Sequence, residues 1–257
     1  AKEVFALLGQ DVTLSEGDTP EEGKTNLLVG IQGEESPAAD YFETHTIAAK
    51  DLFEKTDSYA LEIGEGTIAV LGVSTDAAFY GLTSLKHIFS QVGNREVRSL
   101  RIEDFADVKT RGFIEGYYGN PWSHEDRLDL MKFGGDYKLN GYFYAPKDDP
   151  KHNAKWRELY TEDELQKHKE LAEAGNKSKC YYIYALHPFM HNAVNFGDNY
   201  ARDLKIIEDK FEQLMQVGVK QFAILADDAA VPGGNPQNYV TLMTDLTEWI
   251  KTKQSEY

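Results

Sequence analysis

Short apolar runs alternate with helix-like patterns along the second part of the chain. Four runs rich in aromatic and branched side chains are typical of buried strands, and they lie at Gly112–Glu115, Asn140–Ala145, Cys180–Leu186 and Gln221–Ala226. Between these runs the apolar residues recur every three or four positions, which indicates helices. The pattern therefore predicts repeated strand, loop and helix units.

Capping patterns mark the starts of two of these helices. Ser123 is followed by acidic residues in the first predicted turn, and Thr161 has Glu164 at the capping-box spacing. Two further helices are predicted from about residue 200 to 217 and from about residue 238 to 255. Repeated βα units predict parallel strands, in a doubly wound sheet or in part of a (β/α)₈ barrel, and both architectures place chemistry at the carboxyl ends of the strands.

The first part of the chain, to about residue 108, mixes strand and helix periodicities. Thr25–Ile31 and Thr67–Val73 are strand-like, residues 34–37 are loop-like, and the apolar residues within Asp76–Val92 have the spacing of a helix face. We expect a small non-catalytic α/β domain over residues 1–108 and a barrel-type domain over residues 109–257.

The formal charge of −16 limits the partners that we expect. Nucleic acids and anionic membrane surfaces bind mainly through Lys and Arg, so we expect no nucleic-acid partner and no membrane partner, and neutral ligands are favoured. The sequence has no apolar run of about 18 residues, and its charged start lacks the apolar core of a signal peptide. The single cysteine, Cys180, excludes an intrachain disulfide.

Asp227 and Asp228 directly follow the last predicted strand, and the chain then turns through residues 232–234. Successive strand residues point to opposite faces, so two adjacent acids can share a pocket only where the strand ends. Like charges held close together raise one pKa, which would keep one carboxyl protonated as a general acid while the other stays ionised. The alternative is that Asp227 caps or turns the chain and Asp228 is solvated.

A metal site is a second chemical interpretation of the acid pair. Asp148 and Asp149 could complete a carboxylate cluster for Mg²⁺ or Ca²⁺, but Lys147 would lie beside it and the ligands show no regular spacing. Three further residues suggest zinc but match no closed ligand set, and are better explained as ordinary polar or buried residues: Cys180, His187 and His191. We expect no metal and no cofactor.

Aromatic residues gather near two predicted strand ends. Tyr117, Tyr118 and Trp122 form one group and residues 142–144 form the other. Their flat faces could stack on the C–H side of a pyranose, but barrel packing uses the same residue types. Because strand residues alternate between faces, we expect about half of them to lie in the core.

Three long motifs follow one another in the second part of the chain. They are Arg111–Trp122 (RGFIEGYYGNPW), Tyr144–Pro150 (YAPKDDP, followed by His152 and the KWR of residues 155–157) and Phe222–Asp228 (FAILADD). Together they resemble glycoside hydrolase family 84, which holds the O-GlcNAcases and the clostridial enzymes long called hyaluronidases. The resemblance covers about residues 110 to 230, and the upstream region looks like the non-catalytic N-terminal domain of that family.

The resemblance implies a (β/α)₈ barrel and a retaining, substrate-assisted cleavage of β-linked N-acetylglucosamine. The acetamido oxygen of the substrate would attack the anomeric carbon and form an oxazoline, as in families that depart from the usual two-carboxylate scheme. Carried over by motif, Asp227 would hold and polarise the acetamido N–H, and Asp228 would be the acid and then the base. Gly116, through its backbone, and Lys147 would bind sugar hydroxyls of glycans or glycoproteins that contain N-acetylglucosamine.

The chain departs from the best-known O-GlcNAcases in two short segments. It has His187-Pro188-Phe189 where a Ser-Pro-Gly turn would follow the third strand, and Ala229 and Ala230 follow the acids in place of a larger apolar residue. These variations are similar to the hyaluronidase-annotated branch, which implies a bacterial protein that is secreted or held at the cell surface.

The sequence stops at Tyr257, after the fourth predicted βα unit. We therefore expect the first half of a barrel, truncated after its fourth unit, whose outer strands have unpaired edges that a missing segment or a second chain would complete. The alternative function is a glycan-binding fragment or module that holds N-acetylglucosamine without turnover.

Overall fold

The computed structural model describes residue 17 and residues 19–45, 47–92, 96–226, 229 and 234–256. The chain forms two compact units, Ala1–Thr110 and Arg111–Tyr257. Within the described ranges, no helix has both the length and the hydrophobicity that crossing a bilayer requires.

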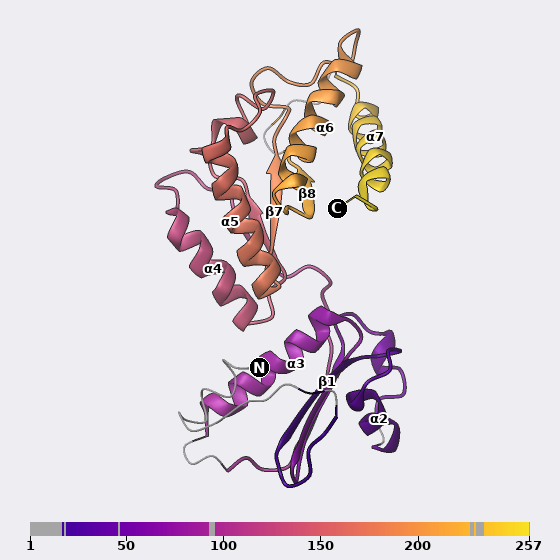
Figure 1. Ribbon diagram of the computed structural model, residues 1–257. Helices are drawn as coiled ribbons and strands as arrows, with labels where there is room; N and C mark the ends of the chain where they lie inside the picture. The colour runs from indigo at the N-terminus through magenta and orange to yellow at the C-terminus, as the bar shows by residue number, and fades with distance from the viewer. Residues whose placement is uncertain are drawn as a thin grey trace. The chain divides into compact units, whose positions relative to one another are not determined.

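The first unit contains a mixed sheet with helices on both faces (Figure 1). Its described strands, in the order β1-β3-β2-β4, are β1 Asn26–Ile31, β3 Thr67–Gly72, β2 Tyr59–Gly64 and β4 Leu100–Asp104. β1 and β3 are parallel, and β2 is antiparallel to β3 and to β4. The helical segments are α2 Pro37–Thr44, the short 3₁₀ turn η1 Leu52–Glu54 and α3 Thr75–Ser90.

Alternation along the strands explains why helices cover both faces of this sheet. Leu61 and Val70 pack with residues of α3, whereas Ala60 and Leu71 pack with residues of α2. The predicted strands and helix are confirmed as β1, β3 and α3, but the pattern did not predict β2 or β4. The expected loop at residues 34–37 is wrong at its last residue, because Pro37 starts α2 and the Ser36 hydroxyl accepts the Ala39 N–H at 3.2 Å.

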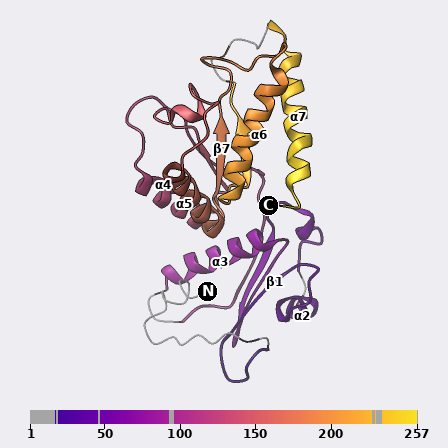
Figure 2. The ribbon, with the colours of Figure 1, turned by 45° about the horizontal axis from the view of Figure 1, so that its top comes forward.

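The second unit is a parallel sheet in which each strand is followed by a helix (Figures 1 and 2). The described strands, in the order β5-β6-β7-β8, are β5 Gly112–Glu115, β6 Gly141–Tyr144, β7 Tyr181–Leu186 and β8 Gln221–Ile224. The helical segments are α4 His124–Asp136, the 3₁₀ turn η2 Pro150–His152, α5 Glu162–Ser178, α6 Tyr200–Gln216 and α7 Gln237–Lys253. The predicted fold class, an α/β domain followed by parallel βα units, is confirmed.

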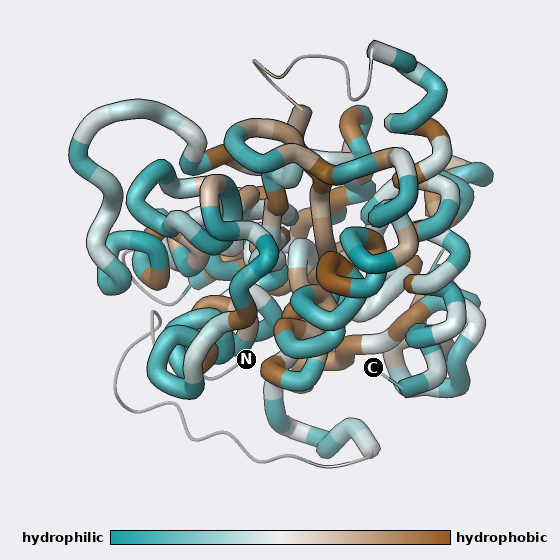
Figure 3. Tube along the Cα trace, turned by 90° about the horizontal axis from the view of Figure 1, so that it is seen from above, coloured by the Kyte–Doolittle hydropathy of each residue, from teal (hydrophilic) through white to brown (hydrophobic). Residues whose placement is uncertain are grey.

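Local signals fix where two of these helices begin. Both predicted caps form full capping boxes: the Ser123 hydroxyl accepts the Asp126 N–H, and the Thr161 hydroxyl accepts the Glu164 N–H. In the tube coloured by hydropathy, many coiled segments alternate between hydrophilic and hydrophobic residues along each turn, as amphipathic helices do (Figure 3). Apolar residues of α5 and α6 pack in the same buried cluster as residues of β6 and β7.

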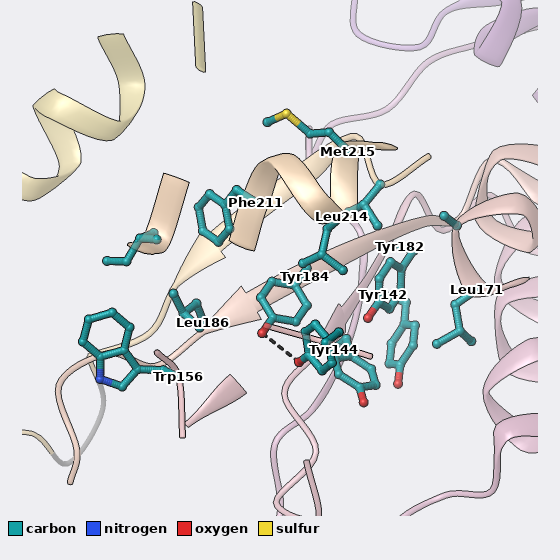
Figure 4. Packing of buried hydrophobic residues seen from close by; sticks show 14 of the residues in the cluster. Tyr142, Tyr144, Trp156, Leu171, Tyr182, Tyr184, Leu186, Phe211, Leu214 and Met215 are labelled. Atoms are coloured by element: carbon teal, nitrogen blue, oxygen red, sulfur yellow. Dashed lines mark hydrogen bonds between the residues drawn. The ribbon is translucent and has the colours of Figure 1, made fainter. Parts of the chain in front are cut away.

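A row of tyrosines forms the core between the sheet and its helices (Figure 4). Tyr142 and Tyr144 of β6 and Tyr182 and Tyr184 of β7 occupy alternate positions, so they point to the same side of the sheet. They pack in one cluster with aliphatic and aromatic residues of α5 and α6: Leu171, Ile207, Phe211 and Leu214. The Tyr184 hydroxyl lies 2.9 Å from the Tyr160 hydroxyl, so these two buried hydroxyl groups are hydrogen-bond partners.

Candidate active site

The strand register brings the predicted site segments to one edge of the second sheet. Glu115 of β5 pairs with Tyr144 of β6, Tyr144 pairs with Tyr184 of β7, and Leu186 of β7 pairs with Ile224 of β8. Because all four described strands of this sheet are parallel, their carboxyl ends meet at the same edge. This is the edge at which barrel enzymes place their chemistry.

Gly116 and Lys147 come from neighbouring strand ends. Gly116 directly follows β5 and is half-buried, and Lys147 lies in the loop that follows β6. The Lys147 Nζ lies 5.2 Å from the centroid of the Tyr118 ring, which belongs to the same loop as Gly116. Tyr118 is 77% exposed, so this cation–π contact stands at the surface of the edge. The structure thus brings the Gly116 loop and Lys147 together.

The predicted acid pair, Asp227 and Asp228, lies outside the described residues. β8 ends at Ile224, two residues before the predicted end at Ala226, and the Leu225 N–H then donates to the Leu186 carbonyl at 2.8 Å. This bond continues the pairing of β8 with β7 up to the edge that carries Gly116 and Lys147. The roles of the two carboxyls stay predictions from sequence.

A buried ion pair that the sequence analysis did not single out lies directly behind the Gly116 loop. Glu115 is 1% exposed, and Arg127 of α4 donates from Nε to its Oε2 at 2.8 Å and from Nη2 to its Oε1 at 2.9 Å. The Tyr142 hydroxyl also donates to Glu115, and so does the Trp122 N–H, at 3.2 Å. The one available signal was an acidic residue at the end of an otherwise apolar strand run.

The electrostatics of this pair follow from burial and from close opposite charge. Burial would lower the pKa of the Arg127 guanidinium, but the hydrogen bonds to Glu115 and the neighbouring tyrosines outweigh it and raise the pKa. Burial and the hydrogen bond to Glu115 raise the pKa of Tyr142. Arg127 therefore stays charged and the Tyr142 hydroxyl stays protonated at neutral pH.

Asp149 holds the loop after β6 to the tyrosine core. Its carboxylate accepts the Tyr144 hydroxyl at 3.1 Å, the Tyr160 hydroxyl at 2.7 Å and the Lys151 N–H at 2.8 Å. Its neighbour Asp148 instead faces Arg127. Among the described residues, no group of three or more His, Cys, Asp or Glu side chains is placed to hold a metal ion.

Lys210 and Arg157 join the rest of this loop to α6. Lys210, fully buried, donates from Nζ to the carbonyls of Lys151 and Glu158 at 2.8 and 2.7 Å. Burial lowers the pKa of Lys210 to about 7. Arg157 reaches the buried Asp203 with two hydrogen bonds, one of them from Nε to Oδ1 at 3.0 Å. The segment that carries Lys147 is thus fixed at its far end.

The residues that suggested zinc do not meet. Cys180 precedes β7 and His187 follows it, so the length of the strand separates them. Burial raises the pKa of the Cys180 thiol to about 12, which keeps it protonated. His187 is buried and its backbone N–H donates to the His152 carbonyl at 2.7 Å, while His191 is exposed.

The aromatic groups divide between core and surface. Tyr142 and Tyr144 are buried, whereas Tyr117 and Tyr118 are exposed at the strand edge. Trp122 is partly buried and packs edge-on against Tyr117, with ring centroids 5.5 Å apart. Only the group beside Gly116 offers open aromatic faces to a ligand.

Parallel βα units with a lysine and open aromatic rings at the carboxyl ends of the strands are the arrangement expected of a barrel-type enzyme domain that binds a sugar. A family model described as beta-N-acetylglucosaminidase matches residues 111–257, and a model described as glycosyl hydrolase family 20, domain 2, matches residues 7–105. The chain belongs to the β-N-acetylglucosaminidase family, glycoside hydrolase family 84. The resemblance of the three sequence motifs is thereby confirmed.

Known relatives agree with this assignment. The chain is 36% identical over 117 residues to the protein O-GlcNAcases of Rattus norvegicus and Mus musculus, which covers 46% of this chain and 12% of each relative. The solved structure of CpGH84D is 45% identical, has a TM-score of 0.91 and is matched over 98% of this chain and 42% of its own. CpGH84B is 36% identical with a TM-score of 0.67, covering 76% of this chain and 33% of its own.

A more distant structure, an O-GlcNAc hydrolase of Thermobaculum terrenum, is 28% identical with a TM-score of 0.51, over 56% of this chain and 32% of its own. The chain therefore spans less than half the length of each of these relatives.

Proposed function

We propose that the protein containing this chain is a retaining β-N-acetylglucosaminidase that removes β-linked N-acetylglucosamine from glycoconjugates by substrate-assisted hydrolysis. The observation that carries this proposal is the meeting of the Gly116 loop and Lys147 at the carboxyl edge of the sheet. The family match over residues 111–257 supports the substrate class.

The proposed roles of the acid pair follow from the chemistry of the acetamido group. The acetamido oxygen forms a bond to the anomeric carbon while the bond to the leaving oxygen breaks, and Asp228 gives its proton to that oxygen. Asp227 accepts a hydrogen bond from the acetamido N–H and stabilises the positive charge that develops there. Water then opens the oxazoline, Asp228 takes its proton, and the anomeric configuration is retained.

The described residues supply the proposed binding half of the site. Lys147 is half-buried and would donate to sugar hydroxyls, and the backbone of Gly116 would bind a further hydroxyl. Hydrogen bonds of this kind suit a neutral sugar and require neither a metal nor a cofactor.

Hydrolysis of an aryl N-acetyl-β-glucosaminide by the longest natural chain that contains this sequence tests the proposal. Asp228→Asn should lower kcat/KM by about 10²- to 10⁴-fold for a poor leaving group, because a general acid contributes about that factor. The exposed Asp129 of α4 gives the matched control, and Asp129→Asn should leave the rate unchanged. Equal activity of the wild type and Asp228→Asn would contradict the proposal.

The finer mechanism has its own test. Replacing the acetamido group of the substrate by trifluoroacetamido makes the carbonyl oxygen a weaker nucleophile, so kcat/KM should fall steeply if that oxygen attacks. A protein nucleophile would be much less sensitive to the fluorines. The first product observed by NMR should be the β-anomer of the free sugar, as retention requires.

The same assay separates the enzyme from a glycan-binding module. Titration with N-acetylglucosamine that shows tight binding, together with no turnover in the longest natural chain, would favour the module. Turnover would exclude it.

We also propose that the protein is bacterial and is secreted or held at the cell surface. The similarity of His187-Pro188-Phe189 and of the alanines after the acids to the hyaluronidase-annotated branch supports this location. Detection of the protein in the cytoplasm alone, after cell fractionation of the source organism, would overturn it.

A further inference from the structure

We infer that Arg127 is a positioning residue that couples the Gly116 loop to Lys147, so that the two sugar-contacting elements keep one geometry. The inference rests on the proposed function, because it assigns Arg127 a part in sugar recognition without contact to the sugar.

Glu115 is the first half of the coupling. It directly precedes Gly116, and its carboxylate receives four hydrogen bonds, two from Arg127, one from Tyr142 and one from the Trp122 N–H. Two bonds on each oxygen satisfy its acceptor capacity. Since Trp122 stands at the far end of the Gly116 loop, one buried carboxylate holds that loop at both ends.

Asp148 is the second half. It directly follows Lys147, and its Oδ1 lies 3.5 Å from the same Arg127 Nη2 that binds Glu115. The Asp148 side chain is 49% exposed, whereas the Glu115 side chain is 2% exposed. One planar, fully charged group therefore faces a buried carboxylate next to Gly116 and an open one next to Lys147.

The position of Arg127 favours this role over a purely structural one. It lies in the first turn of α4, where the helix dipole favours acids over cations. A buried ion pair is often no more stabilising than an apolar pair of similar volume. Connecting two strand-end loops with defined geometry, however, requires a forked donor, which no apolar residue and no lysine supplies.

The coupling is measured by a double-mutant cycle on the longest natural chain, with kcat/KM for a neutral aryl N-acetyl-β-glucosaminide. Arg127→Lys keeps the charge but loses the fork, and should lower kcat/KM about tenfold or more, since a small misplacement of binding groups has an effect of that size. In a Lys147→Ala background the same change should cost clearly less than in the wild type, because only its effect on the Gly116 loop remains. If Arg127→Lys acted through a general loss of structure, it would lower kcat/KM by the same factor with and without Lys147.

Asp148→Asn is the second variant, because its half-exposed side chain can change without disturbing the fold. It removes only the outer contact of Arg127, so it should lower kcat/KM several-fold with an unchanged melting temperature and should also be non-additive with Lys147→Ala. The exposed Asp129→Asn on the same helix is the control with the same charge change.

The outcomes separate this inference from the proposed function. An active wild type with additive Arg127 and Lys147 effects would overturn the coupling and leave the function in place. If the wild type shows no turnover, the dissociation constant of N-acetylglucosamine is measured for each variant of the cycle. Non-additive effects of Arg127→Lys and Lys147→Ala on that constant would support the coupling. A wild type that neither hydrolyses nor binds the sugar would overturn both.

Discussion

At the scale of single residues, His168 shows how burial changes the pKa of a side chain. It is 4% exposed, its Nδ1 lies 2.8 Å from the Tyr182 hydroxyl, and its ring contacts tyrosines of the core. Burial lowers the pKa of His168 from its ordinary value of 6.5 to about 4. The folded protein therefore holds a neutral imidazole in a range where the unfolded chain binds a proton.

We predict that His168 makes the second unit sensitive to acid. Stability from this group is fully present above pH 6.5 and is lost as the pH falls towards about 4, because the unfolded state binds more protons across that window. At about 1.4 kcal/mol per pKa unit, the loss in free energy of unfolding is about 2 to 3 kcal/mol. His168→Gln can keep the bond to Tyr182 without titrating, so its stability should depend less on pH.

Urea unfolding at pH 7 and pH 4.5, followed by tryptophan fluorescence, checks this prediction. The exposed His191 has a left-handed backbone that asparagine tolerates, so His191→Asn is the matched control. The control should have the same free energy of unfolding as the wild type at both pH values. If the free energy of unfolding fell by the same amount between pH 7 and pH 4.5 in His168→Gln and in the wild type, His168 would not be the cause of the acid sensitivity.

Single residues also show which chemistry was visible in the sequence. Gly116 and Lys147 stand in motifs and follow strand-like runs within two residues, so their place at one edge was predictable. The pairing of Glu115 with Arg127 was not, because the acid in its apolar run does not say which residue, twelve positions further along the chain, would be its partner.

At the scale of elements, glycine permits the close approach of α4 to α5. A Cβ at Gly135, in the last turn of α4, would lie 2.2 Å from the backbone carbonyl oxygen of Ser178, at the end of α5. Backbone cannot yield as a flexible side chain can, so the helix ends would have to move apart. The sequence pattern predicted both helices but not this contact.

We predict that Gly135→Ala destabilises the second unit although alanine is the better helix former. The propensity gain is about 1 kcal/mol, whereas overpacking against backbone costs about 1 to 3 kcal/mol, so the midpoint of urea unfolding should fall. Lys132→Ala, at an exposed position of the same helix, is the control and should change the midpoint little. A midpoint raised by Gly135→Ala would show that the helix ends separate freely.

At the scale of the whole molecule, the two compact units and the strong acidity matter most. All three tryptophans, Trp122, Trp156 and Trp249, belong to the second unit, so tryptophan fluorescence reports on the candidate catalytic part alone. The charge of −16 creates a field that disfavours anionic ligands until salt screens it.

We predict that ionic strength distinguishes anionic from neutral substrates. The screening length falls from about 30 Å at 0.01 M salt to about 3 Å at 1 M, so repulsion of a negative aglycone should weaken. The ratio of kcat/KM for a sulfonated aryl N-acetyl-β-glucosaminide to that for its neutral counterpart should therefore rise with salt. A ratio independent of salt would mean that charges close to the pocket override the overall field.

The sequence by itself determined the parallel βα units, the capped starts of α4 and α5, the candidate residues at the strand ends and the family, because each depends on local periodicity or on a continuous motif. Only the tertiary structure decided that β2 and β4 complete the first sheet, that the strand tyrosines form one core, and that Arg127 faces both Glu115 and Asp148. These features join residues far apart in the chain, and their contacts arise from strand register and helix packing. Neither leaves a signature in any single stretch of sequence.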